Sequence, residues 1–184
     1  MTQIPARDPV HSDRLPDPAS HRTRVSLSLA GLSTAGIAPG VALGGALGVQ
    51  AQRGAWALGL GARLLRAPST LVERTTQLGA TLAAAELSGC WRGSVFEHCL
   101  VGLAGNTWLD PEGVSQPRSA KGVFGALGLR SGFAAQFSRQ FGVFAHLEGL
   151  AVLFPLRAQV DGAEVWAAPS VAGGLAVGAR AHFW

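Results

Sequence analysis

The stretch VSLSLAGLSTAGIAPGVALGGALGVQAQ, residues 25–52, carries no charge and is bounded by Arg24 and Arg53. Its 28 residues are enough to cross a membrane as a helix. Repeated glycines and Pro39, however, disfavour a helix. The large apolar residues also recur at every second position, which indicates strands; they are Val25, Leu27, Leu29, Val41, Leu43, Leu47 and Val49. We therefore predict two strands joined by a turn at AGIAPG, residues 35–40.

The same alternation continues along the chain and predicts eight strands. They cover residues 24–34, 41–52, 55–66, 75–89, 99–109, 121–133, 139–159 and 163–183. The number is even, and each segment is long enough for a tilted membrane strand. Short connections at 53–54 and 135–138 contrast with long polar ones at 67–74 and 110–120, as expected for a barrel with one plain rim. We predict an all-β, eight-stranded antiparallel up-and-down transmembrane β-barrel over residues 23–184.

The composition separates this chain from most soluble domains. Hydrophobic residues make up 48% and charged residues only 14%, where soluble domains have about a quarter charged. Gly accounts for 25 of the 184 residues and lies inside the apolar segments as well as between them. A soluble barrel or sandwich with core aromatics is the alternative, but its solvent face would then consist mostly of Gly, Ala and Ser. The net charge of +4 comes from dispersed arginines, without the basic stripe, stacking aromatics or zinc spacing of a nucleic-acid-binding protein.

Residues 1–22 lack the apolar alternation of the rest of the chain, and we predict that they form a disordered tail. The first 21 residues contain four prolines and several charges, and they lack the apolar stretch of a secretory signal. An outer-membrane destination requires such a signal, so we expect it either to have been trimmed or to lie upstream of this start.

Hairpin geometry predicts the register of two strand pairs, because opposed residues of antiparallel strands share a face. A two-residue turn at Arg53-Gly54 would pair Val49 with Leu58. At Asp161-Gly162 a two-residue turn would place the outward Leu147 opposite Ala176, which faces inward. A three-residue loop over 160–162, or a bulge with the same effect, would pair Leu147 with Leu175.

The C-terminal segment GLAVGARAHFW, residues 174–184, resembles the C-terminal signal strand of bacterial outer-membrane β-barrels. Gly178, Ala181 and Phe183 occupy the last three positions of that pattern. Ala176 stands where a polar residue is usual, and Trp184 extends one residue beyond the usual end, where we expect it at the periplasmic rim.

Together with the eight alternating strands, this segment makes the chain resemble the small barrels of the OmpA and OmpX type, although it has no Tyr. The resemblance implies the outer membrane of a Gram-negative bacterium, membrane lipids as surroundings, and recognition of the last strand by the barrel assembly machinery. We expect a monomer without nucleic-acid partners.

The aromatic residues fall where two interfacial girdles would lie. Trp56, Phe141 and Phe183 are expected at the rim with short turns. Trp108, Phe154 and Trp166 are expected toward the rim with long loops.

Several ionisable residues fall on the inward parity of the strands. They are Arg63, Arg130, His146, Glu148, Arg180 and His182, with Glu86 as a further candidate. A barrel of eight strands has room inside only for side chains, so we predict an ionic network that fills the lumen. Two alternatives remain: a narrow anion-selective pore, or a lipid-modifying enzyme that uses His146 and Glu148. The enzyme would need a nucleophile, and no serine is identifiable beside this pair.

Cys90 and Cys99 flank the segment between the fourth and fifth predicted strands. An oxidising compartment favours a disulfide that staples this hairpin. A metal site that adds His98 would lack a ligand for tetrahedral zinc, and we predict no metal and no cofactor.

The function expected from these features is a structural or surface-exposed role. The barrel would present the loop at 110–120 and the Asp161-Gly162 hairpin, which extends past the membrane because its two strands exceed the membrane span.

Overall fold

The computed structural model describes residues 23–71, 77–112, 120–154, 157–160 and 163–183. Ten strands form in this part of the chain. They are β1 (Arg24–Ala35), β2 (Val41–Arg53), β3 (Trp56–Leu71), β4 (Gln77–Arg92), β5 (Phe96–Glu112), β6 (Ala120–Gln136), β7 (Phe141–Val152), β8 (Arg157–Val160), β9 (Ala163–Ala167) and β10 (Val171–Phe183).

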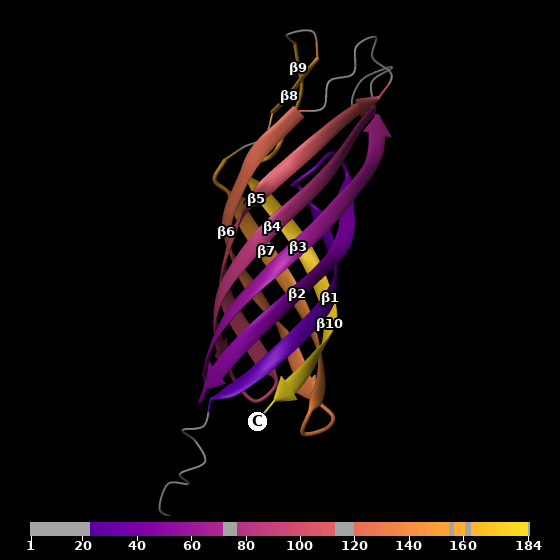
Figure 1. Cartoon of the computed structure of the whole chain (residues 1–184). Helices are drawn as coiled ribbons and strands as arrows, with labels where there is room; N and C mark the ends of the chain where they lie inside the picture. Colours follow the sequence, from indigo (N-terminus) through magenta and orange to yellow (C-terminus); the bar gives the residue numbers. More distant parts are fainter. Residues whose placement is uncertain (1–22, 72–76, 113–119, 155–156, 161–162, 184) are drawn as a thin grey trace, which may run out of the picture.

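Eight of these strands close into one barrel in the order β1-β10-β7-β6-β5-β4-β3-β2 (Figure 1). Every neighbouring pair is antiparallel, and β10 closes the barrel against β1. The predicted fold class is therefore confirmed. Among the described residues, no helix has the length and apolar character needed to cross a membrane.

The last two predicted strands differ from the structure, because each is divided in two. Residues 139–159 give β7 and β8, and residues 163–183 give β9 and β10. Pro169 lies between β9 and β10, where its missing N–H cannot extend the ladder. β8 and β9 pair only with each other and extend above the barrel rim as a separate hairpin (Figure 1).

The register predicted for the two hairpins is right in one case and wrong in the other. Leu147 pairs with Leu175, as predicted, and a register shift between Ala158 and Gln159 supplies the bulge in the hairpin. Val49 pairs with Leu60 rather than Leu58, because Arg53 belongs to the ladder and the turn is Gly54-Ala55. Gly54 has φ of 61°, which suits the first position of a tight hairpin turn. The shift is two residues, so every side chain keeps its predicted face.

The outer face of the barrel wall is apolar, whereas the inner face carries both ionic and apolar side chains. Large apolar side chains lie exposed on the outside; examples are Leu29, Leu47, Leu58, Leu60, Leu100, Leu129 and Leu147. The buried side chains inside the barrel are of two kinds. Some are charged or polar, among them Arg63, Glu97, His146 and Arg180, and the others form an apolar core that includes Leu65, Leu82, Leu103, Phe124 and Leu150. A soluble protein does not combine a large apolar outer surface with buried ionic groups, whereas a membrane barrel does.

Two glycines allow large side chains to lie flat against the inner wall. A β-carbon at Gly132 would lie 2.0 Å from the Ala145 carbonyl oxygen and 2.6 Å from the ring of its cross-strand partner His146. One at Gly178 would lie 2.3 Å from the Leu29 carbonyl oxygen and 2.6 Å from the ring of its partner Phe144. Glycine at these positions thus lets a narrow barrel enclose aromatic rings.

Candidate functional site

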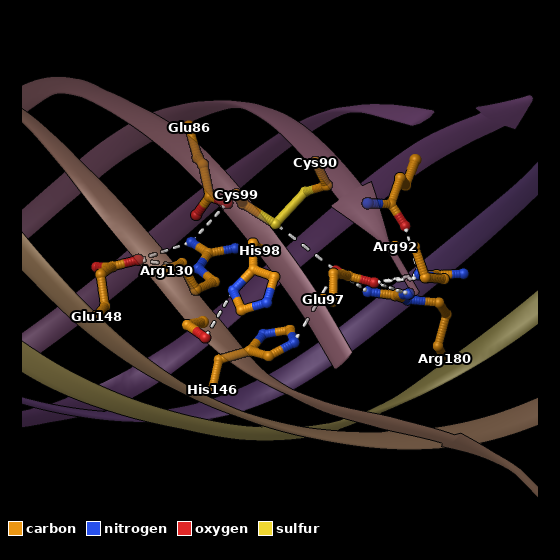
Figure 2. Close-up of a disulfide and its surroundings, with 12 residues drawn as sticks. Glu86, Cys90, Arg92, Glu97, His98, Cys99, Arg130, His146, Glu148 and Arg180 are labelled. Atoms are coloured by element: carbon orange, nitrogen blue, oxygen red, sulfur yellow. Dashed lines mark hydrogen bonds and ion pairs between the residues drawn. A yellow bond between two sulfur atoms is a disulfide. The ribbon is translucent and has the colours of Figure 1, made fainter. Parts of the chain in front are cut away.

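Four ionic side chains from four strands form a ring across the middle of the lumen. Arg63 of β3 donates from Nε to Glu86 of β4 at 2.6 Å, and from both terminal nitrogens to Glu148 of β7 at 2.6 and 2.7 Å. Arg130 of β6 donates to Glu148 at 2.9 and 2.8 Å and also lies 2.8 Å from Glu86. Figure 2 shows Arg130 between the two carboxylates. Each arginine therefore bridges both glutamates, and the ring spans the barrel.

A second ionic cluster lies closer to the rim with short turns and centres on Glu97 of β5, whose side chain is 2% exposed. Arg180 of β10 donates to both oxygens of this carboxylate at 3.0 and 3.1 Å. Arg92, at the end of β4, donates from Nε to Glu97 at 2.8 Å and from Nη1 to Gln52 at 2.6 Å. The Arg180 guanidinium also lies 5.2 Å from the centre of the Phe144 ring. This cluster joins β2, β4, β5 and β10.

His146 lies between the ring and the second cluster. The centre of the His146 imidazole is 4.9 Å from the centre of the Phe144 phenyl ring, and its Nε2 is 3.9 Å from Glu97 Oε1. Within the described part of the chain, neither of its ring nitrogens has a hydrogen-bond partner. Beside it is a cavity of about 60 Å³, which is lined by both ionic groups and has room for a few water molecules. In the middle of the barrel, the described side chains thus leave a small polar cavity rather than an open channel.

The predicted lumen residues divide into three groups. Arg63, Arg130 and Glu148 meet in the ring, where Glu86 completes it. Arg180 belongs to the second cluster and His146 lines the cavity. His182 lies at the mouth of the barrel, where it lines a pocket of about 100 Å³ together with Arg92 and Arg180.

Sequence reasoning missed Arg92 and Glu97, because the predicted strands ended at residue 89 and began at residue 99. The structure extends both strands, so Arg92 shares the inward face of Cys90, and Glu97 shares that of Cys99. The two cysteines could therefore have predicted that Arg92 and Glu97 face the lumen. An inward disulfide fixes the parity of both strands, and that parity turns both ionic residues toward the lumen.

The predicted disulfide is confirmed. Cys90 and Cys99 are cross-strand partners with their Cα atoms 4.0 Å apart, and they are joined through their sulfurs. The bond lies inside the barrel, buried beside Glu97, rather than in the turn itself (Figure 2). Both sulfurs are committed to this bond, and His98 points to the outer face, where it lies 2.9 Å from the Ser131 hydroxyl. The geometry therefore does not support a metal site built from these three residues.

The predicted interfacial aromatics occupy two kinds of position. Trp56, Phe141 and Phe183 are exposed on the outer face near the short turns. Phe154 is exposed toward the other rim and packs over Gly125, and Trp108 is half-buried beneath the Lys121 ammonium. Trp166 lies on β9, in the hairpin above the barrel wall, and packs partly buried against the core.

The predictions for the tail at 1–22, for most of the loop at 110–120, for the Asp161-Gly162 turn and for Trp184 lie outside the described residues.

The arrangement does not assemble the chemistry of a hydrolase at His146 and Glu148. Both Glu148 oxygens accept hydrogen bonds from arginines, so this carboxylate is not free to orient the imidazole. Both side chains are also nearly buried inside the barrel, with exposures of 2% for His146 and 6% for Glu148, whereas a lipid substrate lies outside it.

Comparisons with known proteins relate this fold to outer-membrane barrels. No protein-family model matches the chain, and no curated protein sequence matches it. Among solved structures, a major outer membrane protein from Thermus thermophilus is similar, with a TM-score of 0.60 and 12% identity over 89% of this chain and 100% of that one. Ail, the attachment invasion locus protein of Yersinia pestis, gives 0.55 and 14% over 88% and 97% of the two chains.

Neisserial surface protein A is a third similar structure, with a TM-score of 0.54 and 9% identity over 88% of this chain and 97% of that one. At these identities the likeness concerns the fold. The fold is that of small bacterial outer-membrane β-barrels, and the exposed apolar belt is the surface that such a location requires.

Proposed function

We propose that the chain is a closed outer-membrane barrel that does not conduct solutes and holds extracellular segments, chiefly the β8–β9 hairpin, at the cell surface. The observation that carries this proposal is the ring of Arg63, Glu86, Arg130 and Glu148, which joins four strands across the lumen. A conducting pore would need a continuous water path, whereas these side chains occupy the middle of a narrow barrel.

The position of the hairpin supports the display role. β8 and β9 continue past the barrel on the rim opposite the Gly54-Ala55 turn and the end of β10 (Figure 1). In outer-membrane barrels the short turns face the periplasm and the long segments face outward. Two similar barrels, Ail and Neisserial surface protein A, carry names that refer to attachment and to the surface. Those names describe those proteins; in this chain the role rests on its hairpin.

Three further properties belong to the same proposal. The barrel spans residues 23–184 as one domain and is a monomer surrounded by membrane lipids. β10, with the outward Phe183 at its end, is the segment that the barrel assembly machinery recognises.

Epitope insertion tests the display role. One variant carries a short tag between Asp161 and Gly162, and the matched control carries the same tag between Gly54 and Ala55. On intact cells we expect antibody labelling of the hairpin tag alone, with labelling of the turn tag only after permeabilisation. Labelling of the turn tag on intact cells, or of the hairpin tag only after permeabilisation, would contradict the proposal.

A further inference from the structure

The outer wall of the barrel contains an apolar groove over β1, β2 and β3. Gly45 faces outward and lines the groove, and its outward cross-strand partner Gly31 also lacks a side chain that could fill it. Exposed leucines form the walls; they are Leu29, Leu43, Leu47 and Leu64. The groove has a volume of about 640 Å³ and is open to the surroundings of the barrel. An acyl chain in this groove would therefore contact more apolar surface than one lying against a smooth wall.

A cationic side chain stands at one end of this groove. Arg66 is exposed on the outer face of β3 and lines the groove together with its cross-strand partner Thr81. In the described part of the chain, no carboxylate lies within ion-pair distance of Arg66, whereas the lumen arginines 63, 92, 130 and 180 all have carboxylate partners. Arg66 is thus a charge on the membrane face that no described protein group neutralises.

The row that contains Arg66 continues across the next two strands. Thr81 pairs with Trp108, and Trp108 pairs with Lys121, whose ammonium lies 5.6 Å from the centre of the indole ring. Asp110, the outward carboxylate of β5, lies two positions beyond Trp108. Two cations, a hydroxyl and an indole N–H therefore lie in register on one face, a set of groups suited to phosphate.

The position of Arg66 along β3 places this row at the level of lipid headgroups. From Trp56, at the short-turn rim, the outward residues of β3 include Leu58, Leu60 and Leu64, and Arg66 is the first charged one. Ten residues of a tilted strand rise about 25 Å, which is the height of the apolar band of such barrels. Arg66 therefore lies where the hydrocarbon ends on the side of the β8–β9 hairpin, and the groove lies in the leaflet below it.

We propose that this face binds an acylated, phosphate-bearing glycolipid of the outer leaflet, with one acyl chain in the groove and a phosphate at Arg66 and Thr81. Trp108 and Lys121 contact the sugar and phosphate region beside it. The charge of the row is complementary to the phosphate, and the groove accounts for the acyl chain. The assignment to the outer leaflet rests on the orientation in the proposed function, but binding itself does not depend on that orientation.

Native mass spectrometry of the refolded protein in detergent tests this site. The probe is a bis-phosphorylated lipid A, and the comparison ligands are the same lipid without phosphates and free inorganic phosphate. Arg66→Gln removes the charge, and Gly45→Leu fills the groove. The Gly45 site has space for a β-carbon, which would lie 3.4 Å from the Ala30 carbonyl oxygen. Arg53→Gln and Gly89→Leu make the same changes elsewhere on the outer surface and serve as controls.

We expect both site variants to bind the phosphorylated lipid about tenfold more weakly, with the controls within about twofold of the unaltered protein. We also expect weaker binding of the dephosphorylated lipid and no competition from inorganic phosphate, which lacks an acyl chain. Equal binding by the site variants and their controls would overturn the proposal, as would equal binding of the two lipids. Displacement by inorganic phosphate would overturn it too, because it would indicate a phosphate site that does not need the groove. A heat-dependent shift in gel mobility verifies that each variant is folded.

Discussion

Replacement of Glu148 by glutamine tests the ring in the lumen most severely. Glu148 is 6% exposed and accepts two hydrogen bonds from Arg63 and two from Arg130. Glutamine keeps the size of the side chain, but it is neutral and turns an NH₂ group toward guanidinium donors. The four lumen arginines and three lumen glutamates carry a net charge of +1, which the variant raises to +2.

The loss of one partner from a buried ion pair costs about 3–5 kcal/mol, and we expect Glu148→Gln to reduce the free energy of unfolding by this amount. Arg130→Gln alone should cost less, because it leaves Glu148 bonded to Arg63. The double variant restores a net charge of +1, so its loss should be smaller than the sum of the two single losses.

The assay is urea unfolding of the protein refolded into phospholipid vesicles, followed by tryptophan fluorescence and by gel mobility without boiling. Asp110→Asn, at an exposed position of β5, is the matched control and should change the free energy of unfolding by less than about 0.5 kcal/mol. A loss below about 1 kcal/mol in Glu148→Gln, or strict additivity in the double variant, would show that the ring does not hold the barrel together.

Two other features of the barrel give predictions of their own. Replacement of both Cys90 and Cys99 by alanine should lower the free energy of unfolding by about 2–3 kcal/mol, because the bond closes a loop with a separation of nine residues. Urea unfolding of the variant and of the unaltered protein, with and without reductant, measures this loss. Equal unfolding midpoints of the two proteins without reductant would refute it. Gly132→Ala should destabilise the barrel by about 1–3 kcal/mol, since the new β-carbon would lie 2.0 Å from the Ala145 carbonyl oxygen. Gly149→Ala, where nothing lies within 4 Å of the new carbon, is the control, and equal stability of the two variants would contradict the packing described here.

The alternation of residues predicts the barrel because each side chain of a membrane strand has one of two environments. Leu27 and Leu29 face outward and Ser26 and Ser28 face inward, as their period of two requires. The hairpin β8–β9 was less predictable, because a strand that continues into a hairpin above the membrane keeps the same period. Its boundary depends on where the partner strands end, which is a tertiary property.

The sequence predicted several of the side chains that enter the lumen but not how they pair, because the pairing is also a tertiary property. Parity alone turns Arg63, Arg130 and Glu148 inward, but parity cannot tell which arginine reaches which carboxylate. The Arg63–Glu148 pair joins β3 to β7, which lie across the barrel from each other, so the contact depends on the curvature of the closed wall. Arg92 and Glu97 were missed because the fourth strand was predicted to end at residue 89 and the fifth to begin at residue 99, so both residues were assigned to the turn.

The central claim is that side chains close the lumen. Planar-bilayer recording of the purified, refolded barrel measures this directly, with insertion verified by protease protection of the membrane-embedded part. The ring of Arg63, Glu86, Arg130 and Glu148 predicts no discrete conductance steps at any applied voltage that the bilayer withstands. Reproducible single-channel steps from inserted, folded protein would contradict the account, and anion selectivity of those steps would favour the narrow pore in its place.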